Sequence, residues 1–226
     1  GGRIELWYST GGDDVVTLTE FARIGALRGG NGGSMDINVA DSARVEYAEL
    51  DGVDVDVTVT DDARVETLLL YQGDVVANVS GNGRIDLLRV DSADGDITVT
   101  GNGRVREMQL WEGTHTVSTG DRSMTGSISL DDGADTITTG SGYLEYLRSR
   151  GGDDTVTIGA GGADAITTGL GNDTVTATGS ITSLDTGEGD DDVTVSGYAV
   201  SIRTREGADS VATGGNFVES IHTGAD

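Results

Sequence analysis

Hydrophobic positions recur along this chain at a nearly constant interval of about twenty residues. The steps between equivalent positions shorten from 21 residues near the start to 18 near the end. One column of aliphatic or small residues consists of Val16, Ile37, Val57, Ala77, Ile97, Val117, Ile137, Val156, Val175, Val193 and Val211. Two further columns, three residues apart, begin at Ile4 and Trp7 and keep the same interval. This agreement indicates a repeat architecture over the whole length.

Each repeat contains two short segments in which apolar and polar residues alternate, as in DVTVT (56–60) and ETLLL (66–70). Such alternation is typical of β-strands, and Gly, Asn and Asp gather where the chain must turn. Units this small cannot bury an apolar face alone, so they stack. The pattern predicts an all-β fold over 1–226, a right-handed parallel β-solenoid resembling a β-roll. It would have about eleven coils of 18–21 residues with two short strands each. The absence of Pro agrees, because interior strands must donate their amides.

Composition excludes several classes of partner. A formal net charge of −25 argues against nucleic acid and anionic membranes and favours cations. No Cys is present, which excludes disulfides and thiolate metal sites and fits a secreted bacterial protein. No apolar run is long enough for membrane insertion. The chain begins without Met and ends within a repeat, so we expect a segment of a longer protein or a processed chain.

Acidic residues form a column of their own in the second half of the chain. Five successive repeats carry Asp two positions before the first aliphatic column, at Asp135, Asp154, Asp173, Asp191 and Asp209. A glycine precedes each by two residues, at Gly133, Gly152, Gly171, Gly189 and Gly207. Asp is also a common turn residue, so a purely structural role in capping the turn stays open.

Two adjacent segments, GAGGADAIT (159–167) and TGLGNDTVT (168–176), resemble the RTX family of calcium-binding nonapeptide repeats, with the pattern GGxGxDxUx. The resemblance implies a parallel β-roll in which calcium lies between successive turns, held by Asp carboxylates and glycine-loop carbonyls. It further implies that the five Asp of the column are calcium ligands, with Asp153 and Asp190 beside them. Asp164 would be a lone counterpart on the opposite edge.

Physical chemistry supports a cation at this column. Carboxylates one coil apart repel by about 1 kcal/mol or more even when largely solvated, and a divalent cation converts that repulsion into binding. The equivalent positions in the first half hold Met35, Val55, Val75, Gly95 and His115, so no calcium is expected there. Asp14 has the right position but no stacked neighbour.

The first half carries a column of arginines instead, at Arg3, Arg23, Arg44, Arg64, Arg84 and Arg104. Stacked guanidinium groups need acids nearby, and six are available. They are Asp41, Glu46, Asp61, Asp62, Glu66 and Asp86. We therefore expect two regions within one solenoid: 1–120, with degenerate coils and a structural arginine ladder, and 121–226, with RTX-like calcium-binding coils. An anionic ligand of the arginines is the alternative.

Catalysis is not expected, because His115 and His222 are far apart and the acids form a periodic ladder. A second hypothesis concerns an outward column of hydroxyl and amide residues, which resembles the flat faces of ice-binding proteins. Its members are Thr17, Asn38, Thr58, Asn78, Thr98, Ser118, Thr138, Thr157, Thr176 and Thr194. Ordinary strand propensity also accounts for threonine at such positions.

The sequence therefore predicts a calcium-stabilised structural or adhesive segment, secreted or on the bacterial cell surface. Its partners would be calcium ions and either a second copy stacked end to end, giving a filament, or flanking repeats of the same protein. The main alternative is a type I secretion and folding module of a larger secreted hydrolase or toxin, with ice binding as a further one.

Overall fold

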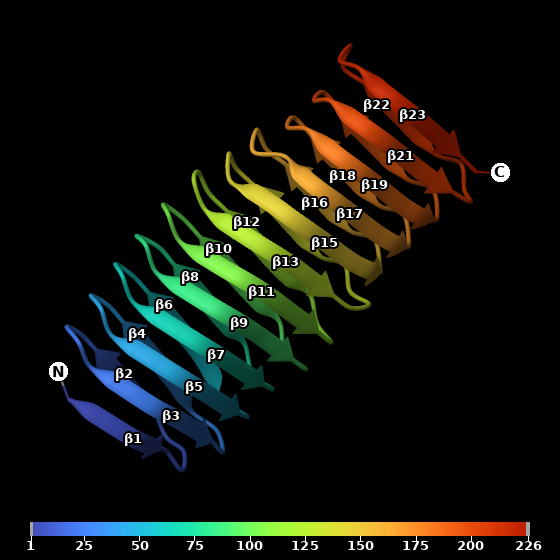
Figure 1. The fold of residues 1–226 in the computed structure, drawn as a ribbon. Helices are drawn as coiled ribbons and strands as arrows, with labels where there is room; N and C mark the ends of the chain where they lie inside the picture. Colours follow the sequence, from blue (N-terminus) through green and yellow to red (C-terminus); the bar gives the residue numbers. More distant parts are fainter. Residues whose placement is uncertain (1, 225–226) are drawn as a thin grey trace.

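The computed structural model describes residues 2–224 as β-strands wound into one long rod, with the two ends of the chain at opposite ends of the rod (Figure 1). Each coil contributes one strand to each of two parallel sheets. The expected β-solenoid of about eleven coils with two strands per coil is confirmed.

Sheet A contains the twelve odd-numbered strands in chain order. They are β1 (Arg3–Tyr8), β3 (Arg23–Gly30), β5 (Arg44–Asp51), β7 (Arg64–Tyr71), β9 (Arg84–Asp91), β11 (Arg104–Trp111), β13 (Met124–Leu130), β15 (Tyr143–Gly151), β17 (Ala163–Leu170), β19 (Ile181–Glu188), β21 (Ala199–Arg205) and β23 (Val218–Thr223). Sheet B contains the eleven even-numbered strands. They are β2 (Asp14–Leu18), β4 (Ser34–Val39), β6 (Asp54–Val59), β8 (Val75–Val79), β10 (Gly95–Val99), β12 (His115–Thr119), β14 (Thr136–Thr139), β16 (Thr155–Ile158), β18 (Thr174–Ala177), β20 (Asp192–Val195) and β22 (Ser210–Thr213).

Equivalent residues of successive coils are direct neighbours in the sheets, as in the series Ile37, Val57 and Ala77. Each column read from the sequence is therefore a physical stack with a spacing of about 4.8 Å. The turn from sheet A into sheet B is nearly constant in length: five positions separate Leu70 from Val75, and also Thr168 from Asp173, while Gly29 and Met35 are six apart. The later shortening of the coil from 20 to 18 residues occurs in the other turn, so the residues flanking the first turn keep the same spacing from Leu50 and Val55 onward.

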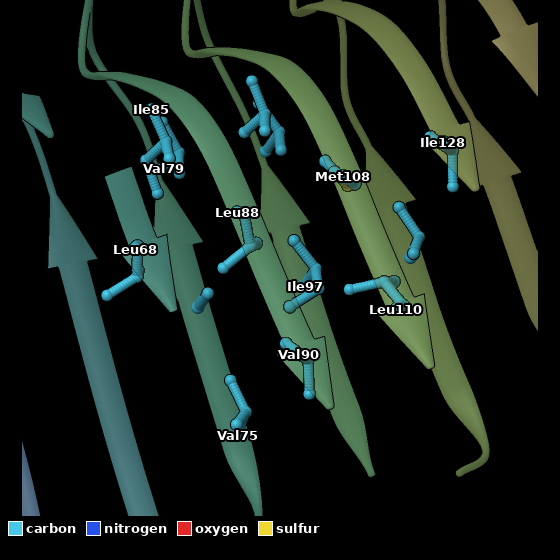
Figure 2. Close-up of a cluster of buried hydrophobic side chains, with 14 of the residues drawn as sticks. Leu68, Val75, Val79, Ile85, Leu88, Val90, Ile97, Met108, Leu110 and Ile128 are labelled. Carbon is cyan, nitrogen blue, oxygen red and sulfur yellow. The ribbon is translucent and has the colours of Figure 1, made fainter. Parts of the chain in front are cut away.

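A thin apolar core fills the space between the sheets, and Figure 2 shows Ile85, Leu88 and Ile97 pointing into it from β9 and β10. Sheet B strands alternate strictly between buried and outward residues. Sheet A strands place two consecutive residues outward in mid-strand, so their inward residues Val65 and Leu68 lie three apart. This geometry explains the three-residue spacing of the two apolar columns in the sequence.

No helix among the described residues is long and apolar enough to span a membrane.

Candidate metal centre

The aspartate column lies inside the solenoid, at the end of the turn from sheet A into sheet B. Asp135, Asp154, Asp173 and Asp191 are each no more than 2% exposed, and Asp209 is partly buried. Carboxylates rarely lie this deep unless a partner compensates the loss of hydration. The column is therefore part of the core.

One oxygen of each carboxylate accepts a hydrogen bond from the main chain of the preceding coil. The Asp154 amide donates to Asp173 Oδ1 at 2.9 Å, and the Asp173 amide donates to Asp191 Oδ1 at 2.9 Å. In the first half of the chain the equivalent Val75 amide donates to the Asp94 carbonyl oxygen at 3.0 Å. The Asp Oδ1 atom thus accepts the hydrogen bond that a backbone carbonyl accepts in the first half of the chain. This is the structural role of capping the turn.

The second oxygen of each carboxylate has no hydrogen-bond partner among the described residues. Oδ2 is buried and unpaired in Asp135, Asp154, Asp173, Asp191 and Asp209. A buried oxygen left without a partner costs about 1–3 kcal/mol, and more when it carries charge. Turn capping accounts for Oδ1 and leaves Oδ2 unexplained.

Hydroxyl residues of sheet A face the aspartates across the turn. They are Ser149, Thr168, Thr186 and Thr204, all fully buried. Each hydroxyl has one proton, and two of these protons go to the main chain. Ser149 Oγ donates to the Thr168 carbonyl at 3.3 Å, and Thr168 Oγ1 donates to the Thr186 carbonyl at 2.8 Å. Those two hydroxyls therefore face the carboxylates with their lone pairs.

Burial raises the pKa of Asp135 and Asp154 to about 6 and that of Asp173 to about 7, from 3.8. Burial raises the pKa of Asp191 as well. The amides that donate to Oδ1 offset part of the rise, while neighbouring carboxylates add to it. The column therefore binds either protons or another cation near neutral pH.

The energetic balance favours a positive charge in this column. Two charges about 4.8 Å apart repel by about 3 kcal/mol at the effective dielectric constant of about 20 that suits protein sites. This repulsion is larger than the value of about 1 kcal/mol for largely solvated carboxylates, because the carboxylates of the column are buried.

Side chains alone do not make a complete metal cage. Within residues 2–224, no group of three or more Asp, Glu or His side chains converges on one point. Calcium takes six to eight oxygen ligands and accepts carbonyls and hydroxyls. Oxygen ligands of these kinds are present at the column: the unpaired Oδ2 atoms, the facing hydroxyl oxygens and the turn carbonyls. The residues therefore fit calcium.

The first half of the rod keeps this corner of the core apolar. Val55 and Val75 occupy the aspartate position, and Leu50 and Leu70 occupy the hydroxyl position. His115 lies where the two types meet and is 1% exposed, and neither ring nitrogen has a partner within residues 2–224. Burial lowers the pKa of His115, so the ring is neutral at neutral pH.

Three further predicted ligands lie outside the core. Asp153 and Asp190 point outward beside the column, and their Oδ1 atoms accept the amides of Asn172 and Ala208 at 2.7 and 2.8 Å. Asp164 is exposed on the outer face of β17, where its carboxylate raises the pKa of Tyr143 to about 12 by accepting a hydrogen bond from it. None of the three side chains faces the buried column.

Four of the five predicted turn glycines adopt positive φ: Gly152, Gly171, Gly189 and Gly207. A Cβ on Gly171 would lie 2.3 Å from the carbonyl oxygen of Gly152 in the preceding coil. The turns therefore require glycine for both conformation and close stacking. Gly133 does not adopt positive φ, but a Cβ there would also meet a carbonyl, that of Gly113 at 2.2 Å.

The predicted arginine residues form one column on the outer face of sheet A: Arg3, Arg23, Arg44, Arg64, Arg84 and Arg104. Within the described residues, two arginines of this column form ion pairs, Arg64 and Arg84. Asp86 binds both Arg64 and Arg84, and Glu66 lies 4.0 Å from Arg64. Asp41 and Asp61 instead accept backbone amides. The continuous ladder expected from sequence is thus reduced to one cluster around Asp86.

Sequence reasoning missed the facing hydroxyl column. A signal was present five residues before each aspartate, where leucine at Leu110 and Leu130 changes to Ser149 and then to threonine. Alignment of that third column at the same interval would have found it.

Comparisons with sequence families, with curated proteins and with solved structures gave no match for this chain.

Proposed function

We propose that this chain is a calcium-stabilised structural β-solenoid of RTX type that acts outside the cell as an adhesive or filament-forming segment. The observation that carries the proposal is the row of buried aspartate Oδ2 atoms without partners. A coil needs no charge there for folding, since Val55 and Val75 fill the equivalent position in two coils of the first half. Aspartate at that position is best explained by a bound cation.

An extracellular setting fits the acidic composition and the absence of Cys. Calcium is scarce inside cells and abundant outside, so a calcium-dependent segment would fold on export. The same property suits a secretion and folding module of a larger secreted hydrolase or toxin, which is the alternative within this class. Either further repeats or a second copy would add to the sheet edges at β1 and β23, which pair with one strand each within the described residues.

Isothermal titration of the calcium-free chain with CaCl₂ at pH 7.5 tests the proposal. We expect binding of several calcium ions, with magnesium much weaker because it demands a smaller octahedral site. The matched variant is Asp173→Asn, which keeps the Oδ1 acceptor and removes the charge. It should lower the number of bound ions while the fold, followed by circular dichroism, is kept. Absence of calcium binding by the intact chain would refute the proposal.

Ice binding is a second candidate, because the structure adds a threonine column beside the one seen in the sequence. On the outer face of sheet B, Thr136, Thr155 and Thr174 stack next to Thr138, Thr157 and Thr176. The result is a two-column hydroxyl surface over three coils. Thermal hysteresis of the purified chain tests it, with Thr155→Tyr as the variant expected to abolish the effect. No hysteresis at high protein concentration would remove this candidate.

A further inference from the structure

A cleft of about 470 Å³ opens on the outer face of sheet A. Its lining residues come from β1, β3, β5 and β7 and the residue after β3, and these strands lie near the N-terminal end of the rod (Figure 1). The side chains around it are Tyr8, Arg28, Asn31, Glu49, Asp51 and Tyr71. This volume lies in the range of small-molecule sites in proteins. The cleft is far along the chain from the aspartate column.

A missing side chain creates the hollow. Gly30 stacks in the column that continues with Asp51, Tyr71, Asp91 and Trp111, so one coil lacks the outward side chain of its neighbours. A Cβ on Gly30 would lie 2.8 Å from the carbonyl oxygen of Asp51, which leaves glycine as the residue that fits. The floor of the cleft is therefore bare backbone.

The core supports this floor from below. The neighbouring Gly29 faces inward, and a Cβ built there would lie 2.6 Å from Met35 Cε. Met35 is 2% exposed and fills the space that an inward side chain would take. The backbone at the floor is thus packed on its inner side and open on its outer side.

Two aromatic rings stand at the ends of the cleft. Tyr8 is 62% exposed, and Tyr71 is partly exposed three coils away. Three strand spacings correspond to about 14 Å along the rod. Arg89 lies 5.8 Å from the centre of the Tyr71 ring and covers one side of it, so the exposed Tyr8 ring and the other side of Tyr71 give a ligand two flat faces to pack on.

Polar groups between the rings supply both donors and acceptors. Arg28 pairs with Glu49 at 3.5 Å and lies 5.7 Å from the centre of the Tyr47 ring, so its position is fixed on two sides. The side chains of Asp51 and Asn31 make no hydrogen bond within residues 2–224, which leaves their oxygens and the Asn31 amide group free for a ligand.

We propose that this cleft binds a short, uncharged oligosaccharide that lies along the rod axis. A pyranose ring has an apolar C–H face for each tyrosine and hydroxyls for the carboxylate, amide and guanidinium groups. An anion is disfavoured, because the one cationic group is already paired and two carboxylates are present. An apolar ligand is disfavoured, because apart from the two tyrosine rings the lining is polar side chains and glycine backbone.

Titration of the whole chain with cellotriose, maltotriose and mannotriose, followed by saturation-transfer NMR and calorimetry, tests the proposal. We expect one of the three to bind, with contacts to tyrosine ring protons. Tyr71→Ala should weaken binding by about tenfold or more, as expected for a buried aromatic contact. Asp51→Asn should also weaken it while keeping the shape of the side chain. Tyr146→Ala, on the same face of sheet A but outside the cleft, is the matched control.

Binding that Tyr71→Ala weakens and Tyr146→Ala leaves intact supports the proposal. Absence of binding by all three sugars at millimolar concentration would overturn it, as would binding that both Tyr71→Ala and Asp51→Asn leave unchanged. A control titration with choline tests whether the tyrosines hold a cation instead, and choline binding without sugar binding would also overturn it. Calcium is not involved in this site, so its outcome is independent of the proposed function.

Discussion

In calcium-free buffer, the coils of residues 135–209 are expected to lose stability as the pH rises from about 4 to about 7. Burial raises the folded-state pKa of Asp135 and Asp154 to about 6 and that of Asp173 to about 7, against 3.8 when unfolded. The folded chain therefore binds more protons than the unfolded chain in this window, and its stability falls with rising pH. At about 1.4 kcal/mol per pKa unit, each carboxyl contributes a loss of about 3–4 kcal/mol.

His115 acts in the opposite direction. Its folded-state pKa is lowered from 6.5 by burial, so the stability of its neutral form is present above pH 6.5 and is lost as the pH falls. Four carboxyls with raised pKa outweigh this single residue. Urea unfolding at pH 5 and pH 8 without calcium, followed by circular dichroism, measures the net effect.

Calcium should reverse this dependence, because a bound divalent cation favours the ionised carboxylates. We expect the urea midpoint at pH 8 to rise strongly on addition of millimolar calcium, and the midpoint at pH 5 to change little. A calcium-free chain as stable at pH 8 as at pH 5 would contradict the burial of the aspartate column.

Replacement of Asp173 by asparagine should change stability in opposite directions with and without calcium. The carbonyl oxygen of the new asparagine side chain would keep the acceptor for the Asp154 amide, and the buried charge would be lost. At pH 8 without calcium, Asp173→Asn should stabilise the chain by up to about 4 kcal/mol, given a pKa of about 7 in the folded state. With calcium, the same variant should be less stable than the parent, because one ligand is missing.

Asp173→Ala is the matched comparison, because it removes both the charge and the acceptor. The Asp154 amide would then be buried without a partner, at a cost of about 1–3 kcal/mol. We expect Asp173→Ala to be less stable than Asp173→Asn under every condition. Urea midpoints of the three proteins at pH 8, with and without calcium, give all the comparisons. Equal effects of calcium on the parent and on Asp173→Asn would exclude Asp173 as a ligand.

The solenoid could be predicted because the same interval of about twenty residues recurs along the whole chain, which is a stronger signal than the secondary-structure preference of any single segment. The step of twenty residues that relates Ile37, Val57 and Ala77 is also the hydrogen-bonded register of β4, β6 and β8. The register of a parallel stack follows directly from the length of its coils. Aligning the repeats with one another therefore also aligned the strands. The prediction of outward and inward faces followed from the same alternation.

The chemistry of the site was less accessible, because it depends on contacts across the turn and between sheets. Sequence placed the five aspartates in one column but could not say that Oδ1 replaces a backbone carbonyl, as Asp173 does for Asp154. The arginine column was aligned correctly, yet its ion pairs depend on side-chain reach, and Asp86 serves two arginines. The cleft at Gly30 was not found, since it follows from the loss of one outward side chain beside the larger residues Asp51 and Tyr71 of the same column.

Hydrogen–deuterium exchange of the whole chain at pH 7.5, with calcium and after its removal, tests the central claim most directly. Amides in β14 to β22 should be protected with calcium and exchange faster without it, because these coils contain the buried aspartates. Amides in β4 to β10 should exchange equally in both conditions, because methionine, valine and glycine occupy the aspartate position there. Calcium-independent exchange in β14 to β22, or equal calcium protection of both regions, would contradict the account.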